Sequence, residues 1–237
     1  MPYIKRIELV ARPTISSYIR ENLDNIEGKT EPGPFITISR QFGCDGYKLG
    51  DILLEKLLER EGEDSWQLYK KEILKQLAED SGLTEDVIEK ERKAKPNLIR
   101  EFFRGVRRNN LPGGYEIRNK ITFMVRTVAF EGYAIIIGQG GTAATADLGG
   151  GISVRIEAPK DWRIIRVSRR DNMLKEEAAA KLEKIEKERS HLRNIYEEKN
   201  PRKPAFNLTI DNSKFTLDEI ADLIIYAMEQ KGLIKAE

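Results

Sequence analysis

Short apolar segments alternate with helix-like segments along this chain, and that alternation limits the folds it can adopt. AIII at 134–137 is a continuous apolar run, which is typical of a strand buried on both faces of a parallel sheet. Strands that are separated by helices form parallel sheets with right-handed crossovers. The sequence therefore predicts an α/β fold. Its five expected strands are 35–39, 66–69, 134–137, 152–157 and 206–210.

The composition excludes several kinds of functional site. Cys44 is the only cysteine and His191 the only histidine among 237 residues. One chain therefore contains neither a disulfide scaffold nor a cysteine or histidine cluster for a metal ion. His191 lies in a charged helical run, KIEKERSHLRN, which does not favour a catalytic role. What remains is phosphate chemistry, which uses backbone amides, Lys, Arg and Mg²⁺.

Charge and hydropathy also constrain the partners and the location that we expect. The formal net charge is +2, which does not favour nucleic acid as a partner. No apolar run approaches the roughly 18 residues that span a bilayer, and the N-terminal residues lack a secretory apolar region. We therefore expect a cytoplasmic protein that binds neither nucleic acid nor membrane.

Residues 36–57, ITISRQFGCDGYKLGDILLEKL, are typical of a strand, a glycine-bearing turn and an amphipathic helix. This is the layout of a phosphate-binding loop, in which the helix N-terminus attracts anions. The usual G-x-x-x-x-G-K-[ST] motif is absent. Arg40 replaces its first glycine, Asp45 replaces its second glycine, and Gly46 replaces its lysine. We expect Arg40 or Lys48 to replace that lysine, and Lys48 to stand where a hydroxyl residue usually holds Mg²⁺. The alternative is a plain strand-to-helix turn.

A second glycine turn, IIIGQGGTAATADLGGGISVRIE, superficially matches a dinucleotide-binding fingerprint. Gly138, Gly140 and Ala143 fit the glycine pattern, and Glu157 lies where an acid would bind the ribose. However, only the 14 residues Gly138–Gly151 separate the two strands, which is too short for the usual unit of about 30 residues. The turn still follows a central parallel strand, where α/β proteins bind ligands.

Four segments in order resemble the cytidylate kinase-like family, a divergent branch of the P-loop nucleoside monophosphate kinases. They are ITISRQFG-x-x-G, WQLYKKEILKQLAEDSGLTEDVIE, YAIIIGQGG, and VRIEAPKDWRIIRVSRR continued to FNLTIDNS. The resemblance covers about residues 35–230. It implies a three-layer α/β/α P-loop kinase domain at 35–237, with a helical arginine-bearing lid at about 171–203. Residues 1–34 would then form an N-terminal helical extension and a linker.

The resemblance also implies a reaction, in which ATP with Mg²⁺ phosphorylates a nucleoside monophosphate such as CMP or dCMP. Lys48, Arg189 and Arg193 would be catalytic, the two arginines reaching the transferred phosphate from the lid. Either arginine could instead pair with a glutamate one turn away on an exposed helix. The donor phosphates would lie against Arg40, Gly43, Cys44, Asp45, Gly46, Tyr47 and Lys48, and the acceptor against Gln139, Gly140, Arg166, Arg170 and Asp211.

Departures from the family pattern leave alternatives open. Gln139 replaces an arginine, Gly140 replaces an acid, and Lys70 stands where an acid usually follows the second strand. A catalytically impaired nucleotide-binding sensor on the same fold is therefore the main alternative. A nucleic-acid-binding protein that uses the basic segment 100–110 is another. The apolar face of a predicted helix at 13–27 is expected to pack on the domain or across a homodimer.

Overall fold

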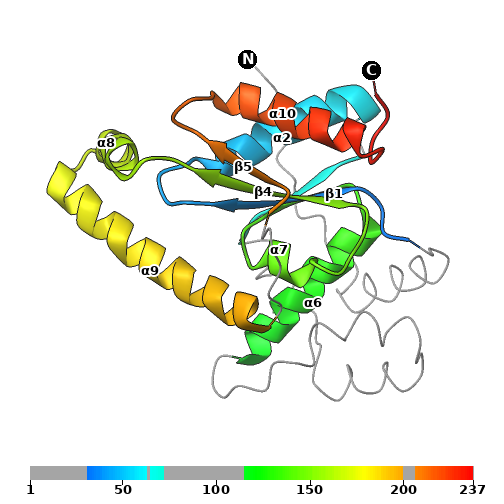
Figure 1. Cartoon of the computed structure of the whole chain (residues 1–237), viewed down its shortest axis with the longest axis horizontal. Coiled ribbons are helices and arrows are strands. Elements are labelled where there is room, and N and C mark those ends of the chain that lie inside the picture. Colours follow the sequence, from blue (N-terminus) through cyan, green and yellow to red (C-terminus); the bar gives the residue numbers. More distant parts are fainter. Residues whose placement is uncertain (1–30, 63–64, 72–114, 200–205, 237) are drawn as a thin grey trace, which may run out of the picture.

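The computed structural model describes residues 31–62, 65–71, 115–199 and 206–236 (Figure 1). The predicted N-terminal helix at 13–27 and the basic segment at 100–110 lie outside these ranges, so the expected homodimer stays a prediction. The strands are β1 (Phe35–Arg40), β2 (Gln67–Tyr69), β3 (Ala134–Ile137), β4 (Gly151–Glu157) and β5 (Leu208–Asp211). The helices are α2 (Gly46–Glu61), α6 (Tyr115–Glu131), α7 (Gly141–Ala144), α8 (Lys160–Asp171), α9 (Lys175–Lys199) and α10 (Leu217–Gln230).

The five strands form one parallel sheet in the order β2-β3-β1-β4-β5, which confirms the predicted fold class. β1 lies in the centre, where Ile38 is in register with Ile137 of β3 and Val154 of β4. The turns that follow β1 and β3 therefore lie side by side at the carboxyl edge of the sheet. Ligands of α/β proteins bind at this edge.

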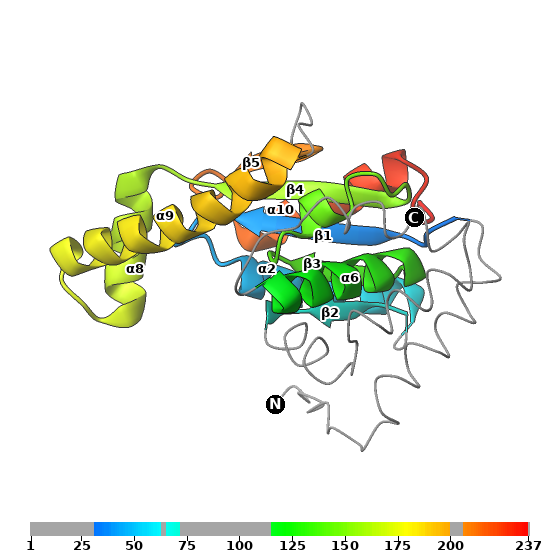
Figure 2. The same cartoon turned by 90° about the horizontal axis from the view of Figure 1, so that it is seen from below.

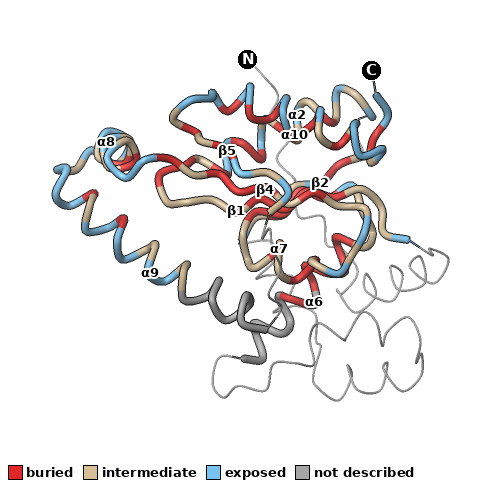
Figure 3. Tube along the Cα trace, viewed as in Figure 1, coloured by how far each residue is buried: buried red, intermediate tan, exposed pale blue. Residues whose placement is uncertain are grey.

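Helices cover both faces of the sheet, as the three-layer prediction requires. α2 and α10 lie on one face, and α6 and α7 lie on the other (Figure 1). Ile36 and Ile38 of β1 belong to a buried cluster with Leu53 of α2 and Ile224 of α10. Thr37, which alternates with them, faces α7, where its Oγ1 lies 3.1 Å from Oγ1 of Thr142. The interior of the sheet is buried along its length (Figure 3).

The predicted strand boundaries agree with the structure to within two residues. The predicted strand at 206–210 begins at Leu208. Asn207, just before it, still donates its backbone N–H to the carbonyl of Ser153 at 2.9 Å. Its side-chain oxygen also accepts hydrogen bonds from the backbone N–H and the hydroxyl of Ser153, each at 2.8 Å. A capping box starts α10. Thr216 Oγ1 accepts from Glu219 N at 3.2 Å, and Glu219 Oε2 accepts from Thr216 N at 2.7 Å.

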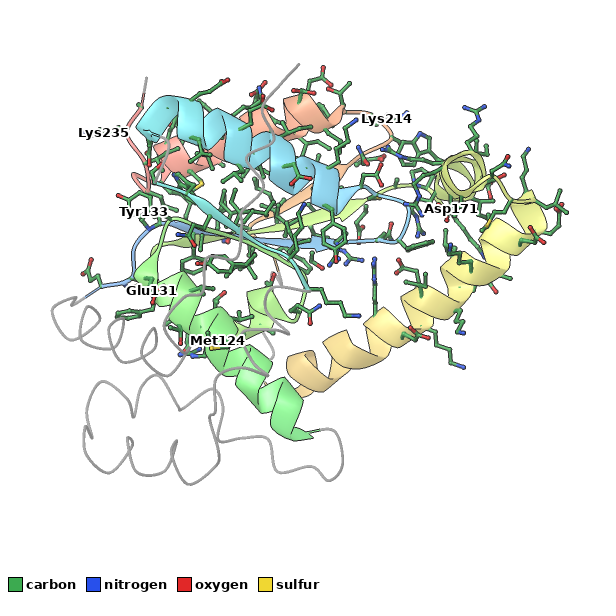
Figure 4. The ribbon with its side chains drawn as sticks, turned by 180° about the vertical axis from the view of Figure 1, so that it is seen from behind. Met124, Glu131, Tyr133, Asp171, Lys214 and Lys235 are labelled. Carbon is green, nitrogen blue, oxygen red and sulfur yellow. The ribbon has the colours of Figure 1, made fainter. Side chains whose placement is uncertain are left out.

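α8 and α9 project beyond the carboxyl edge and form the crossover between β4 and β5 (Figure 2). Asp171 joins them at their corner, with one oxygen 2.7 Å from Arg170 Nε and the other 2.8 Å from Lys181 Nζ. In Figure 4 Asp171 lies at the opposite end of the molecule from Glu131 and Tyr133. No helix in the described part of the chain is long and apolar enough to cross a membrane.

Candidate functional site

The first glycine turn connects β1 to α2 in a compact form. Gly43 has a φ of +95°, in the region that favours glycine, and a Cβ atom placed on it would lie 2.9 Å from Cβ of Arg163. Cys44 is buried, and that burial raises the pKa of its thiol to about 11. Leu49 N donates to the carbonyl of Asp45 at 2.9 Å, which starts the helix. The turn is thus built against α8, and its thiol is a packing group.

The side chain of Arg40 extends from the first glycine turn to the second. Its aliphatic carbons pack on Gly46, where an added Cβ would lie 2.9 Å from Cγ of Arg40. At its far end, Nη1 fills the position that a Cβ on Gly138 would take. Its guanidinium also lies 5.1 Å from the ring centre of Tyr47. Burial, and then the nearby charge of Arg189, lower the pKa of Arg40 to about 10, so it remains a cation at neutral pH.

The second turn is entirely left-handed. Gly138, Gln139 and Gly140 have φ values of 72°, 55° and 70°. Gln139 adopts this conformation although it has a side chain, at a cost of about 1 kcal/mol. The helix that follows, α7, has only 4 residues. The rejection of the dinucleotide fingerprint is therefore confirmed, since no long crossover helix follows the turn.

Arg166 and Arg170, which the resemblance assigned to the acceptor nucleotide, meet the first turn instead. Arg166 Nη2 lies 2.7 Å from Oδ2 of Asp45, and Arg170 Nη1 lies 3.4 Å from Oδ1 of the same carboxylate. Arg170 also covers the ring of Phe42 at 5.4 Å. The structure therefore brings both arginines to the predicted donor loop, and the two oxygens of Asp45 face guanidinium groups.

Arg189 of α9 reaches the first turn, as predicted for a lid arginine. Its Nη1 donates to the carbonyl of Arg40 at 3.1 Å, and its guanidinium lies 5.7 Å from the ring centre of Phe42. Burial lowers its pKa. The side chain of Arg193, the other predicted lid arginine, lies outside the described residues, and its role stays a prediction.

Three further charged residues belong to this site and were missed from the sequence. Arg163 of α8 donates from Nε to the carbonyl of Ala158 at 2.9 Å and from Nη1 to that of Phe42 at 3.1 Å. Glu186 of α9 accepts a hydrogen bond from Phe42 N. Arg155 of β4 donates to the Glu157 carboxylate at 2.9 Å and to Ser39 Oγ at 2.9 Å.

Sequence signals for two of these residues exist. Arg163 precedes Arg166 by three residues and Arg170 by seven, so helical periodicity places all three on one face. Arg155 interrupts the apolar run of a central strand, ISVRIE, where a charge needs partners. Glu186 gave no such signal, because it is one of many glutamates in a charged helix.

The remaining predicted residues are more scattered. Lys48 lies exposed on the first turn of α2. Counted strictly from Arg40, the hydroxyl position of the usual motif falls on Tyr47, one residue before Lys48. Asp211 accepts from Ser213 N at 2.8 Å, and hydrogen bonds from Ser213 lower its pKa. Asp211 is the last residue of β5, whereas Gln139 follows β3 on the other side of β1, so the sheet does not bring these two together.

Acidic side chains at the site contact arginines and are not arranged as a metal cluster. Among the described residues, no group of three or more His, Cys, Asp and Glu side chains is placed to hold a metal ion.

Comparisons with known proteins place the chain among a family and beside solved structures. A model of the "Cytidylate kinase-like family" matches residues 35–214. The chain is similar to the crystal structure of an uncharacterized protein from Eubacterium ventriosum, with 23% identity, a TM-score of 0.63, and coverage of 83% of this chain and 98% of that chain. TT1252 from Thermus thermophilus is 15% identical over 84% of this chain and 98% of that chain, with a TM-score of 0.42. A search of curated proteins finds no significant match.

Proposed function

The chain belongs to the cytidylate kinase-like family, and we propose on that premise that it transfers the γ-phosphoryl group of ATP to a nucleoside monophosphate. CMP or dCMP is the first acceptor to test. One observation carries the proposal, namely that the half-buried side chain of Arg40 extends from the first glycine turn to Gly138 of the second. A cation in that position contacts both turns at the edge where the donor and acceptor phosphates would meet.

The transfer requires little covalent chemistry from the protein itself. An oxygen of the acceptor phosphate forms a bond to the γ-phosphorus while the bond to the β-phosphate oxygen breaks, which gives ADP and a nucleoside diphosphate. Catalysis of this step is mainly positioning and stabilisation of charge. Arg40 from the first turn and Arg189 from α9 supply positive charge close to each other at the turn, and Arg189 would bind the transferred group.

The residues present fit ATP and Mg²⁺ in this role. The first turn offers backbone amides at the start of a helix together with guanidinium groups, which suits a polyphosphate. Mg²⁺ usually keeps several waters and binds through substrate phosphates and one or two carboxylates, so a dedicated protein cluster is not required. Asp45 is the carboxylate within the turn. When bound, Mg²⁺ would neutralise charge on the donor phosphates.

A second candidate function is a nucleotide sensor that binds without turnover. Two contacts favour it. Asp45 binds the guanidinium of Arg166, and Glu186 accepts from the backbone N–H of Phe42, so these two carboxylates already take donors that would otherwise bind phosphate. A sensor would be stabilised by a nucleotide, by about 2.7 kcal/mol at 100 times Kd, and would form no product.

The test is incubation with Mg-ATP and a panel of nucleoside monophosphates, followed by chromatography of ADP and the diphosphate. We expect Arg189→Met to lower kcat/KM at least 100-fold, since arginines that act on the transferred phosphate contribute about 10³–10⁵ in rate. Arg169→Met is the matched control, because Arg169 is exposed on α8 and makes none of the contacts described at the site. Equal loss in both variants, or none in either, would remove Arg189 from the mechanism. No product with clear stabilisation by one nucleotide would favour the sensor.

A further inference from the structure

Glu186 makes an unusual contact for a residue in the middle of a charged helix. Its Oε1 accepts a hydrogen bond from Phe42 N, an amide inside the first glycine turn. The same oxygen lies 3.6 Å from Nη1 of Arg163. Its side chain is 21% exposed, whereas Glu183 one turn earlier is 65% exposed and pairs with Lys160 at the surface. Glu186 is therefore inserted into the site.

The groups around this carboxylate form an oxyanion subsite. A turn amide combined with a guanidinium is the donor set that binds phosphate oxygens in proteins. Arg163 is fixed in place, because it is buried and its Nε donates to the carbonyl of Ala158 at 2.9 Å. Arg189 lies three residues after Glu186 on α9 and also reaches the turn. The donors thus stay in place if the carboxylate leaves.

We propose that Glu186 occupies a phosphate-oxygen subsite formed by Phe42 N and Arg163, so that α9 and the phosphates of a bound ligand compete for the first turn. This inference rests on the proposed function, because it concerns the same site. It assigns Arg163 to phosphate binding and gives α9 a second role, that of an internal competitor. The ligand class is an inorganic or nucleoside polyphosphate.

Competition of this kind has a measurable consequence. A bound polyphosphate must displace a charge-assisted hydrogen bond before its own oxygen can take the amide. Replacing the carboxylate with a neutral amide of the same shape weakens the competitor, because hydrogen bonds to charged groups are about twice as strong as neutral ones. Affinity for polyphosphate should therefore rise, by about tenfold, when Glu186 becomes glutamine.

The experiment is calorimetric titration of the full chain with inorganic tripolyphosphate, in wild type, Glu186→Gln and Glu183→Gln. We expect a Kd about tenfold lower in Glu186→Gln and an unchanged Kd in Glu183→Gln, the matched control on the same helix. Glu186→Ala, measured in parallel with a thermal melt, should also bind more tightly than wild type. Because alanine has no amide, the Glu186→Ala variant distinguishes the loss of the competing carboxylate from a new contact between the glutamine amide and the ligand.

The outcomes separate this inference from the proposed function. Equal affinities in all three proteins would overturn competition by Glu186 and leave phosphate transfer intact. Weaker binding in Glu186→Gln would overturn it as well, since Glu186 would then support the ligand site. Tighter binding without nucleotide turnover in any protein would uphold the subsite and count against the kinase. No binding of tripolyphosphate by any of them would overturn both.

Discussion

Replacement of Gly43 by alanine tests whether the first turn is built against α8. Gly43 has a φ of +95°, and a Cβ there would lie 2.9 Å from Cβ and 3.3 Å from Cγ of Arg163. These atoms belong to the rigid stem of a buried side chain and cannot rotate away. Alanine at this position therefore requires both a strained backbone and a displacement of Arg163.

The two costs can be estimated separately. A residue with a side chain at a sparsely populated positive φ costs about 1–3 kcal/mol. Forcing an extra methyl into packed surroundings costs about 1–3 kcal/mol more. We therefore expect Gly43→Ala to lower the free energy of unfolding by about 4 kcal/mol, which for a chain of this size lowers Tm by about 8–16 °C. Displacement of Arg163 should also weaken tripolyphosphate binding.

Two other glycines separate these contributions. Gly62 has a φ of +104° with no atom near its Cβ position, so alanine there meets only the backbone cost. Gly149 has neither a positive φ nor a close neighbour, so alanine there should be neutral or stabilising by up to about 1 kcal/mol. Thermal and urea unfolding of the three variants gives the comparison. If Gly43→Ala loses no more stability than Gly62→Ala, the contact with Arg163 costs nothing and the argument fails.

Two further predictions concern titration. Burial raises the pKa of Cys44 to about 11, so only about 0.1% of this thiol is thiolate at pH 8. Iodoacetamide should therefore label the native chain far more slowly than the chain unfolded in guanidinium. Equal labelling rates would contradict this prediction. Hydrogen bonds from Arg170 and Lys181 lower the pKa of Asp171 far below its unfolded value of about 3.9, so its contribution to stability is complete above that value and is lost progressively as the pH falls from there through the lowered folded pKa. Asp171→Asn should therefore destabilise the fold at pH 7 by about 0.5–1 kcal/mol and by progressively less as the pH falls below about 3.9. A difference between the two proteins that stays constant as the pH is lowered would refute the assignment.

The fold was predictable because its signals are local. A continuous apolar run, alternating strands and helical periodicity each reflect the burial of nearby residues, and the apolar run placed β3 at the bounds that the structure shows. A capping box is similarly contained in four residues, Thr216–Glu219. The order of the strands in the sheet is not local, and it was not predicted from the sequence.

The site was predictable in part, for the same reason. Both glycine turns and Arg40 follow directly from strands, so sequence position fixes where they lie. The partners of Asp45 depend on how α8 crosses the carboxyl edge, which no local pattern encodes. The sequence therefore did not predict that Arg166 and Arg170 pair with Asp45, and it did not identify Glu186 at all.

The pattern of charge pairing explains how an aspartate can stand in a phosphate-binding turn. Asp45 is matched by Arg166 and Arg170, Glu157 by Arg155, and Glu186 by Arg163. Among the described residues, Arg40 and Arg189 are the site arginines that form no ion pair with a carboxylate, and burial lowers the pKa of each although the charge of Glu186 partly offsets this for Arg189. Like charges held together in this way are relieved by a bound anion. The aspartate thus neutralises arginines of α8 and leaves outside these ion pairs the two cations that the proposed reaction assigns to phosphate.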